Sequence, residues 1–379
     1  MPDPLYFCEL LPNIKQVSVS IESQDGEIPT SVAPHPSKRA LTVKYGVRTT
    51  HIMLPTPIDP PSITLVPAKT YRLSASQAYL SSGEYESLSG PVQDPWDASS
   101  VSPDCSLCCI ACTTTILQRG RIQKWKNLPS EHWADMMDLW HCHKPHNKDG
   151  NSEGSRYSGV GRIVAESTVG LVDPMYFLLR REDCENIAFK QAKSNEAETA
   201  VCQVCDIPLG IVDEKADGIR LMKWSLSLRL GSFKENGDEL LDSFTLSQWL
   251  SAHLQFLVDN TGQRKFLVRP GASILSQQHL DGSGKRIEET NEGVHIWVFN
   301  PNTLITRSEK PTPARAVKVY YQKVTSKEEV DGLGDIEAVY LPQAVYDRFE
   351  RLLEEGNASL PKDLRTWAGL WKGGWLEKF

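Results

Sequence analysis

Residues 101–112 read VSPDCSLCCIAC, so four of the chain's nine cysteines fall within eight positions. A second cysteine pair lies far downstream in residues 201–205, VCQVC. Two thiolates separated by two residues can hold one metal ion, because a tight turn points both sulfur atoms inward. Two such pairs complete a tetrahedral site. The spacing therefore predicts a structural zinc that joins two distant segments in one fold.

The predicted zinc ligands are Cys109, Cys112, Cys202 and Cys205, with Cys142 or His143 as a substitute for one of them. The alternative is that some of these cysteines are ordinary buried thiols, since cysteine is often buried without a ligand role. The N-terminal sequence MPDPLYFCELLP has no positively charged start and no long apolar run, so we expect no export signal. Reducing compartments favour metal binding over disulfides.

The charge balance restricts the classes of partner. The chain has 379 residues and a formal net charge of −7, with an isoelectric point near 5.8. Nucleic acids and anionic membranes favour a basic protein face, so we expect no direct nucleic-acid binding. No apolar stretch approaches the roughly 18 residues of a membrane helix, and we expect no membrane association. The cytoplasm and the nucleus are the expected locations.

The order of patterns along the chain predicts an α+β fold. Residues 1–86 form a β-rich N-terminal region, in which QVSVSIES alternates apolar and polar residues as a half-buried strand does. Residues 87–104 are a polar linker leading into an exposed cysteine segment. Residues 105–215 form a cysteine-rich, zinc-stabilised middle. Residues 216–379 form an α+β C-terminal region with a tryptophan-rich tail, in which LPQAVYDRFERLLEEGN predicts a helix.

The sequence contains no signature of a common hydrolase or transferase. It has no P-loop, no GxSxG, no HExxH and no GxGxxG between a strand and a helix. The HCHKPH stretch at 141–146 is similar to the HxHxDH motif of metallo-β-lactamase nucleases but lacks its aspartate. These motifs give no prediction of an enzyme class.

The order of the landmarks resembles a known family. CIACTTTIL, LPSEHWADMMDLWHCH, CQVCDIPLG, KWSLSL, HIWVFNPN and RAVKVYYQ together resemble the HECT-like, ubiquitin-conjugating-enzyme (E2)-binding family over essentially the whole chain. The most specific element is W-x6-W-x-C-H, made of Trp133, Trp140, Cys142 and His143. Fungal members of the family include a factor important for pre-mRNA cleavage and polyadenylation.

One function implied by this resemblance is that of an E3 ubiquitin ligase or an E2-binding cofactor. A HECT-type ligase needs an exposed, activated cysteine nucleophile. The chain has no cysteine after Cys205, so the C-terminal region offers no thiol for this step. The resemblance thus leaves enzymatic activity open and implies a ubiquitin-conjugating enzyme as a partner.

The other implied function, which we predict in preference to the ligase, is that of a regulator or assembly partner of the pre-mRNA 3′-end cleavage and polyadenylation endonuclease, a di-zinc enzyme of the metallo-β-lactamase type. The chain would insert residues 101–105 into the active site of that enzyme and inhibit it. VSPDC looks like a Pro-Asp-Cys plug used against related nucleases. On this interpretation Pro103 stiffens the approach, Asp104 meets metal or basic groups, and Cys105 coordinates the nuclease zinc, with Cys108 as the fallback thiol. The alternatives are that Cys105 belongs to the chain's own zinc site or is an idle loop thiol.

Overall fold

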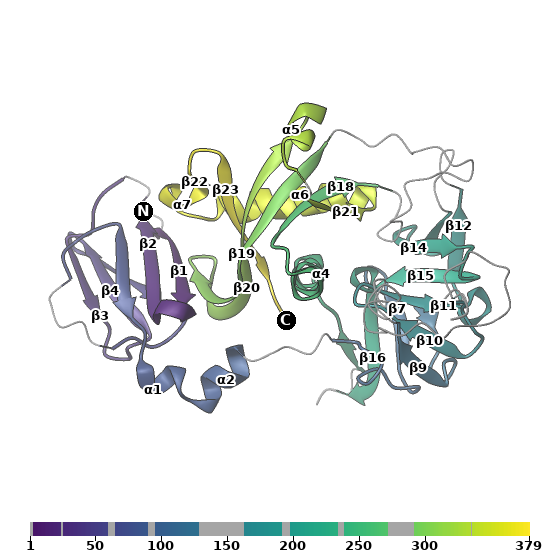
Figure 1. The fold of residues 1–379 in the computed structure, drawn as a ribbon. Coiled ribbons are helices and arrows are strands. Elements are labelled where there is room, and N and C mark those ends of the chain that lie inside the picture. Colours follow the sequence, from purple (N-terminus) through teal and green to yellow (C-terminus); the bar gives the residue numbers. More distant parts are fainter. Residues whose placement is uncertain are drawn as a thin grey trace, which may run out of the picture. The chain divides into compact units, whose positions relative to one another are not determined.

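A computed structural model describes residues 3–23, 26–59, 65–89, 95–128, 163–191, 198–233, 239–271, 292–334 and 336–379. The chain forms two compact units (Figure 1). Unit 1 contains Met1–Val92 and Thr245–Phe379, and unit 2 contains Gln93–Phe244. The predicted helix around Trp133 and Trp140, and with it Cys142 and His143, lies outside the described residues.

Unit 1 is built on a nine-stranded sheet whose main path runs β22-β23-β20-β19-β1-β2-β6, while β18 joins β19 to β21. Its strands are β1 (Leu5–Leu11), β2 (Gln16–Glu22), β6 (Thr70–Ser74), β18 (Lys265–Pro270), β19 (Gly293–Arg307), β20 (Lys310–Val324), β21 (Glu337–Leu341), β22 (Thr366–Trp367) and β23 (Trp371–Glu377). A separate three-stranded sheet contains β3 (Ser31–Pro34), β4 (Ala40–Tyr45) and β5 (Arg48–Met53).

The predicted alternation in the N-terminal region is confirmed in β2. Val17, Val19 and Ile21 are at most 2% exposed and pack in one core with residues of β1, β4 and β5. Successive residues of a strand point to opposite faces, so the period of two places all three side chains on the core side. The sequence pattern therefore identifies both the strand and its buried face.

The N-terminal and C-terminal regions are not separate bodies, in contrast to the predicted division at residues 86 and 216. Strand β1 pairs antiparallel with β19, and Cys8 lies opposite Thr306. The Thr303 hydroxyl donates a hydrogen bond of 2.7 Å to the Leu10 carbonyl. Residues 216–244 belong instead to unit 2. Local patterns do not reveal this division, because the pairing joins segments almost 300 positions apart.

Six helices of unit 1 are described, and three of them, α4, α6 and α7, contact β23. They are α1 (Gln77–Leu80), α2 (Gly83–Ser89), α4 (Leu246–Thr261), α5 (Lys327–Asp331), α6 (Gln343–Ala358) and α7 (Lys362–Arg365). Helix α4 begins with a capping box between Thr245 and Gln248. The predicted helix α6 continues through Gly356 to Ala358, and Gly356 faces β23, where an added Cβ would lie 3.4 Å from the Trp375 carbonyl oxygen.

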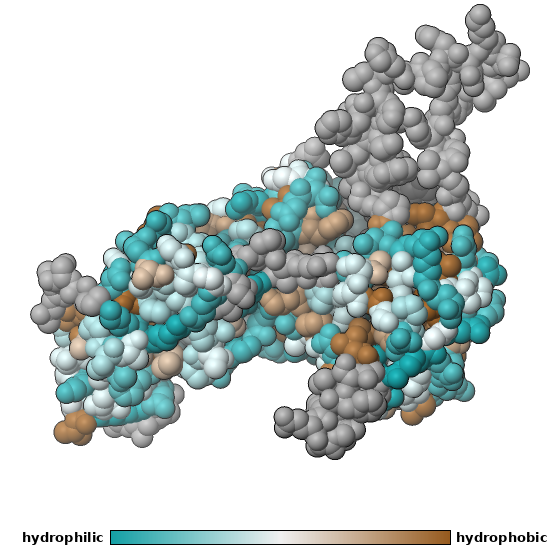
Figure 2. All heavy atoms as spheres, turned by 90° about the horizontal axis from the view of Figure 1, so that it is seen from below, coloured by the Kyte–Doolittle hydropathy of each residue, from teal (hydrophilic) through white to brown (hydrophobic). Residues whose placement is uncertain are grey.

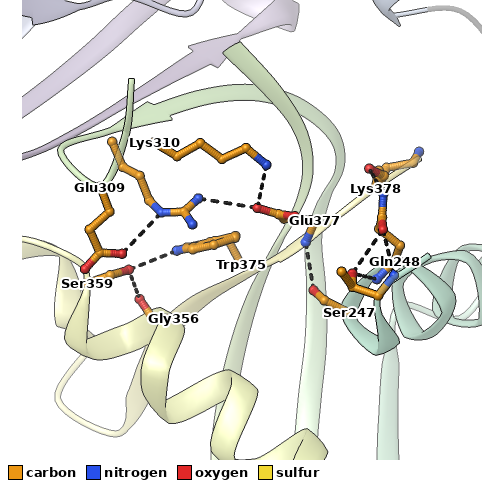
Figure 3. Close-up of polar contacts among 11 residues, drawn as sticks. Ser247, Gln248, Glu309, Lys310, Gly356, Ser359, Trp375, Glu377 and Lys378 are labelled. Atoms are coloured by element: carbon orange, nitrogen blue, oxygen red, sulfur yellow. Dashed lines mark hydrogen bonds and ion pairs between the residues drawn. The ribbon is translucent and has the colours of Figure 1, made fainter. Parts of the chain in front are cut away.

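The tryptophan-rich tail forms strand β23, and polar contacts hold this strand in place (Figure 3). Trp375 Nε1 donates to Ser359 Oγ at 3.3 Å, and the Glu377 amide donates to Ser247 Oγ at 3.0 Å. The Arg307 guanidinium lies 4.1 Å from the centre of the Trp375 ring. The tail is thus an inner strand of the sheet, fastened to α4 and α6.

Unit 2 contains a seven-stranded sheet, β12-β13-β14-β15-β11-β10-β9, and a four-stranded sheet, β17-β16-β7-β8. The strands are β7 (Ser106–Cys109), β8 (Thr115–Leu117), β9 (Lys124–Asn127), β10 (Val169–Val172), β11 (Tyr176–Leu179), β12 (Ile187–Lys190), β13 (Thr199–Cys202), β14 (Pro208–Asp213), β15 (Gly218–Met222), β16 (Leu226–Phe233) and β17 (Glu239–Asp242). The first cysteine pair begins at the end of β7 and the second at the end of β13.

The chain is therefore a mixed, strand-rich α+β protein. Short 3-10 turns occur at Pro12–Ile14, Arg181–Asp183 and Lys223–Ser225. The last of these turns lies between β15 and β16. In the described part of the chain, no helix is long and apolar enough to cross a membrane. Hydrophobic atoms reach the visible surface in small patches between hydrophilic regions (Figure 2).

Candidate metal centre

The two CxxC turns have the same backbone hydrogen bonds. In the first turn the Thr113 amide donates to the Cys109 carbonyl at 2.9 Å, and the Cys109 amide donates to the Thr114 carbonyl at 2.8 Å. In the second, the Asp206 amide donates to the Cys202 carbonyl at 2.8 Å, and the Cys202 amide donates to the Ile207 carbonyl at 2.9 Å. Each turn thus bends the chain so that its two cysteines lie on the same side.

Each turn closes through one residue with left-handed backbone geometry at the same position. Thr113 and Asp206 both follow the second cysteine of their pair, and their φ angles are 59° and 62°. This conformation is costly for a threonine and persists only where the surrounding structure requires it. Aspartate adopts this conformation more readily, so the strain lies mainly at Thr113, and the two turns share one backbone shape.

The four sulfur atoms meet in one cluster. Cys109 Sγ lies 3.6 Å from Cys205 Sγ, and Cys112 Sγ lies 3.5 Å from Cys202 Sγ. All four sulfur atoms lie within 4.8 Å of one another. A tetrahedral zinc with bonds of about 2.3 Å requires sulfur atoms about 3.8 Å apart. The four predicted ligands therefore form a cluster of the size that a tetrahedral metal ion requires.

The protein environment shifts the thiol pKa values of Cys112 and Cys109 in opposite directions. The Thr114 hydroxyl lies 3.2 Å from Cys112 Sγ, and this contact, together with the Thr114 amide, lowers the pKa of the Cys112 thiol to about 6. Burial raises the pKa of the Cys109 thiol to about 12. Cys112 therefore ionises more readily than Cys109, and a thiolate is the form in which cysteine binds a metal ion. Thr114 is a residue that the cysteine spacing alone does not identify.

The sequence comparisons agree with the order of these landmarks. Residues 9–373 match the family described as HECT-like ubiquitin-conjugating enzyme (E2)-binding. The chain belongs to this family. Relatives include uncharacterised proteins of Schizosaccharomyces pombe, 23% identical over 385 residues with 98% of each chain aligned, and of Saccharomyces cerevisiae, 24% identical over 264 residues with 69% of this chain and 66% of the relative aligned. No solved structure matches the chain.

In this HECT-like family member, the segment proposed as a plug forms a tight turn. The Asp104 amide donates to Ser102 Oγ and the Cys105 amide donates to the Ser102 carbonyl, both at 3.1 Å. The side chains of Pro103 and Asp104 are exposed. Cys105 itself is only 2% exposed, and burial raises the pKa of its thiol to about 12. The structure thus presents the proline and the aspartate but covers the thiol.

The fallback thiol is also covered. Cys108 lies in the middle of β7, opposite Ser227 of β16, and is fully buried. Neither Cys105 nor Cys108 belongs to the four-sulfur cluster. The alternative of Cys105 as a ligand in the chain's own metal site therefore finds no support in the described geometry. The substitute ligands Cys142 and His143 lie outside the described residues.

Proposed function

We propose that this chain is a zinc-stabilised protein that binds a ubiquitin-conjugating enzyme without carrying ubiquitin on any described cysteine. The observation that carries the proposal is the four-sulfur cluster within a chain whose family is E2-binding. Four thiolates in tetrahedral arrangement suit zinc, which has no redox chemistry of its own. Four protein ligands leave no open position for water, so the ion's role is structural.

The burial of the thiols argues for binding rather than thioester transfer. A transfer cysteine must be exposed and have a lowered pKa or an adjacent base. Burial raises the pKa of Cys8, Cys105 and Cys184 to about 12 in each case. Cys112 has the lowered pKa, but a metal bound in the cluster would occupy its sulfur. Within the described part of the chain, no cysteine is an exposed thiol outside the cluster.

Two measurements on purified protein test this proposal. Metal analysis is expected to give one zinc per chain, lost in a Cys202→Ser/Cys205→Ser variant and kept in Cys184→Ser, the matched control. Mixing the protein with a panel of ubiquitin-charged E2 enzymes is expected to give binding without a reducible ubiquitin adduct. An adduct on the wild-type chain would refute the non-catalytic role. If the Cys142→Ser variant no longer formed this adduct, the nucleophile would be Cys142, which lies outside the described residues.

A second function is proposed on a specific feature, the exposed turn at residues 102–104. We infer that the chain regulates the pre-mRNA 3′-end processing endonuclease, in the nucleus and the cytoplasm, by inserting this turn into the di-zinc site. The Asp104 carboxylate is exposed and would meet the metals or basic groups that bind substrate phosphate. The Gly120 amide donates to the Pro103 carbonyl at 2.9 Å, which holds the turn in shape. The Cys105 thiol would reach a metal only if the turn opened.

Asp104→Asn and Cys105→Ser distinguish the two ways in which this turn can act. Inhibition of the purified endonuclease that is weakened by Asp104→Asn alone would mean that the turn inserts as it stands. If Cys105→Ser also weakens the inhibition, the turn opens and the Cys105 thiol reaches the metal. Equal inhibition by the wild type and both variants would refute a plug at residues 103–105.

A further inference from the structure

The cysteine turns expose apolar side chains beside the metal cluster. Ile110, in the first turn, is 39% exposed, and Val204, in the second, is 66% exposed. The remaining middle positions, Ala111 and Gln203, are exposed as well. Because all four sulfur atoms lie within 4.8 Å of one another, the two turns are neighbours in space. An isoleucine and a valine thus project from adjoining turns of one centre.

Strand β12, which pairs with the strand that leads into the second turn, carries a further exposed apolar side chain. Ile187 lies opposite Cys202, and Phe189 lies opposite Ala200 in the same antiparallel pair. Directly opposed residues share a face of the sheet, so Phe189 lies on the face that carries the Cys202 sulfur. Phe189 is 38% exposed. We call Ile110, Phe189 and Val204 the knuckle face.

Charged groups lie next to residues of the knuckle face in space or in the sequence. The Arg181 guanidinium lies 4.9 Å from the centre of the Phe189 ring and pairs with Glu198 at 3.5 Å. Lys190 forms an ion pair with Asp206, two residues after Val204. An apolar centre with a charged rim is the usual anatomy of a protein interface.

The backbone holds the knuckle face in one conformation. The matching hydrogen bonds of the two turns fix the positions from which Ile110 and Val204 project, and a bound metal would lock the turns together. Anchors that are ordered before association lose little conformational entropy on binding. Apolar side chains on such rigid turns are therefore suited to contact a partner.

We propose that the knuckle face is the surface on which this chain binds the ubiquitin-conjugating enzyme. This inference rests on the proposed E2-binding function. The family match includes both turns and β12. Small interfaces, which bury less than about 1,200 Å², serve transient encounters. An interface centred on these three side chains would suit an enzyme that must leave after each transfer to be recharged.

The test compares aspartate substitutions on exposed side chains. Ile110→Asp and Val204→Asp, singly and together, are titrated against each member of a purified E2 panel, with zinc content measured on the same samples. Val47→Asp is the matched control, because Val47 is a fully exposed valine of unit 1. We expect each knuckle variant to weaken binding about tenfold or more with zinc retained, and Val47→Asp to bind as the wild type does.

The possible results test the knuckle face and the proposed E2-binding function separately. Binding by the wild type and the double variant with equal affinity would overturn the knuckle face and leave E2 binding intact. Failure of the wild type to bind any E2 would overturn the proposed function, and the inference with it. Should an aspartate variant lose zinc, the milder Val204→Ala decides: weaker binding with full zinc supports the inference, and unchanged binding overturns it.

Discussion

The substitution Lys318→Met tests how much the ion pair between β1 and β20 contributes to the stability of unit 1. Lys318 Nζ in β20 lies 2.6 Å from Glu9 Oε2 in β1. The Glu9 side chain is 5% exposed, and its Oε1 has no hydrogen-bond partner within the described residues. Methionine keeps the packing volume but removes the ammonium group. The substitution therefore leaves a buried carboxylate without its counter-charge.

The expected cost follows from this burial. Removing one partner of a buried ion pair costs about 3–5 kcal/mol, because the remaining charge stays uncompensated. The Lys318 side chain is 23% exposed, so water can partly replace the lost ammonium group. We therefore expect a loss of about 3 kcal/mol, at the lower end of that range. Glu9→Gln together with Lys318→Met should recover more than half of it, since no buried charge then remains.

The assay is calorimetric unfolding of the whole chain, in which the transition of unit 1 is followed. Lys310→Met is the matched control: Lys310 Nζ lies 3.0 Å from Glu377 Oε1, but the lysine is 42% exposed. Glu377 also keeps Arg307 at 3.6 Å. An exposed pair of this kind is worth about 0–1 kcal/mol. If Lys318→Met destabilises unit 1 no more than Lys310→Met does, the reasoning from burial is wrong.

Three further predictions concern other parts of the molecule. Thr114→Val should raise the pKa of Cys112, so iodoacetamide should alkylate the metal-free protein more slowly at pH 7 than the wild type; equal rates would contradict the role of the hydroxyl. Gly210→Ala should cost about 1–3 kcal/mol in thermal unfolding, because its Cβ would enter the backbone of β15, whereas Gly83→Ala, with open space around it, should not destabilise. Burial lowers the pKa of His295 to about 4, so the unfolded chain binds a proton at this histidine at a higher pH than the folded chain does. The free energy of unfolding should therefore fall by up to about 3 kcal/mol as the pH drops from about 6.5 to 4. His295→Gln should reduce this pH dependence in urea titrations, and an unchanged pH dependence would refute the prediction.

Periodicity and spacing predicted what depends on neighbours in the sequence. The alternation at Val17, Val19 and Ile21 gave the correct buried face, because a strand has a fixed period of two. The two CxxC spacings predicted four cysteines that the structure brings together, because a turn of fixed length determines where both sulfurs point. These features needed no knowledge of the rest of the chain.

Features that depend on distant partners were not predictable in the same way. The Pro-Asp-Cys turn favours exposure of all three residues, but burial covers Cys105. Nothing near β1 indicates that β19 is its neighbour. The knuckle face was not predicted for a related reason. The sequence shows that Ile110 and Val204 are apolar, but only the structure shows that their side chains are exposed.

The insertion of unit 2 within unit 1 has a consequence for the order of events during synthesis. Glu9 meets Lys318 only after 309 further residues have been made, which takes roughly 15–60 s at ordinary ribosome speeds of about 5–20 residues per second. Until β19 has been made, β1 lacks its neighbour on one side, whereas β2 can already pair with β1 and β6. Unit 2 is contiguous and ends at Phe244, so it emerges complete before β19 and β20 are made. All four cysteines of the cluster have therefore been made and brought into unit 2 while β1 is still unpaired on one side and exposed to chaperones.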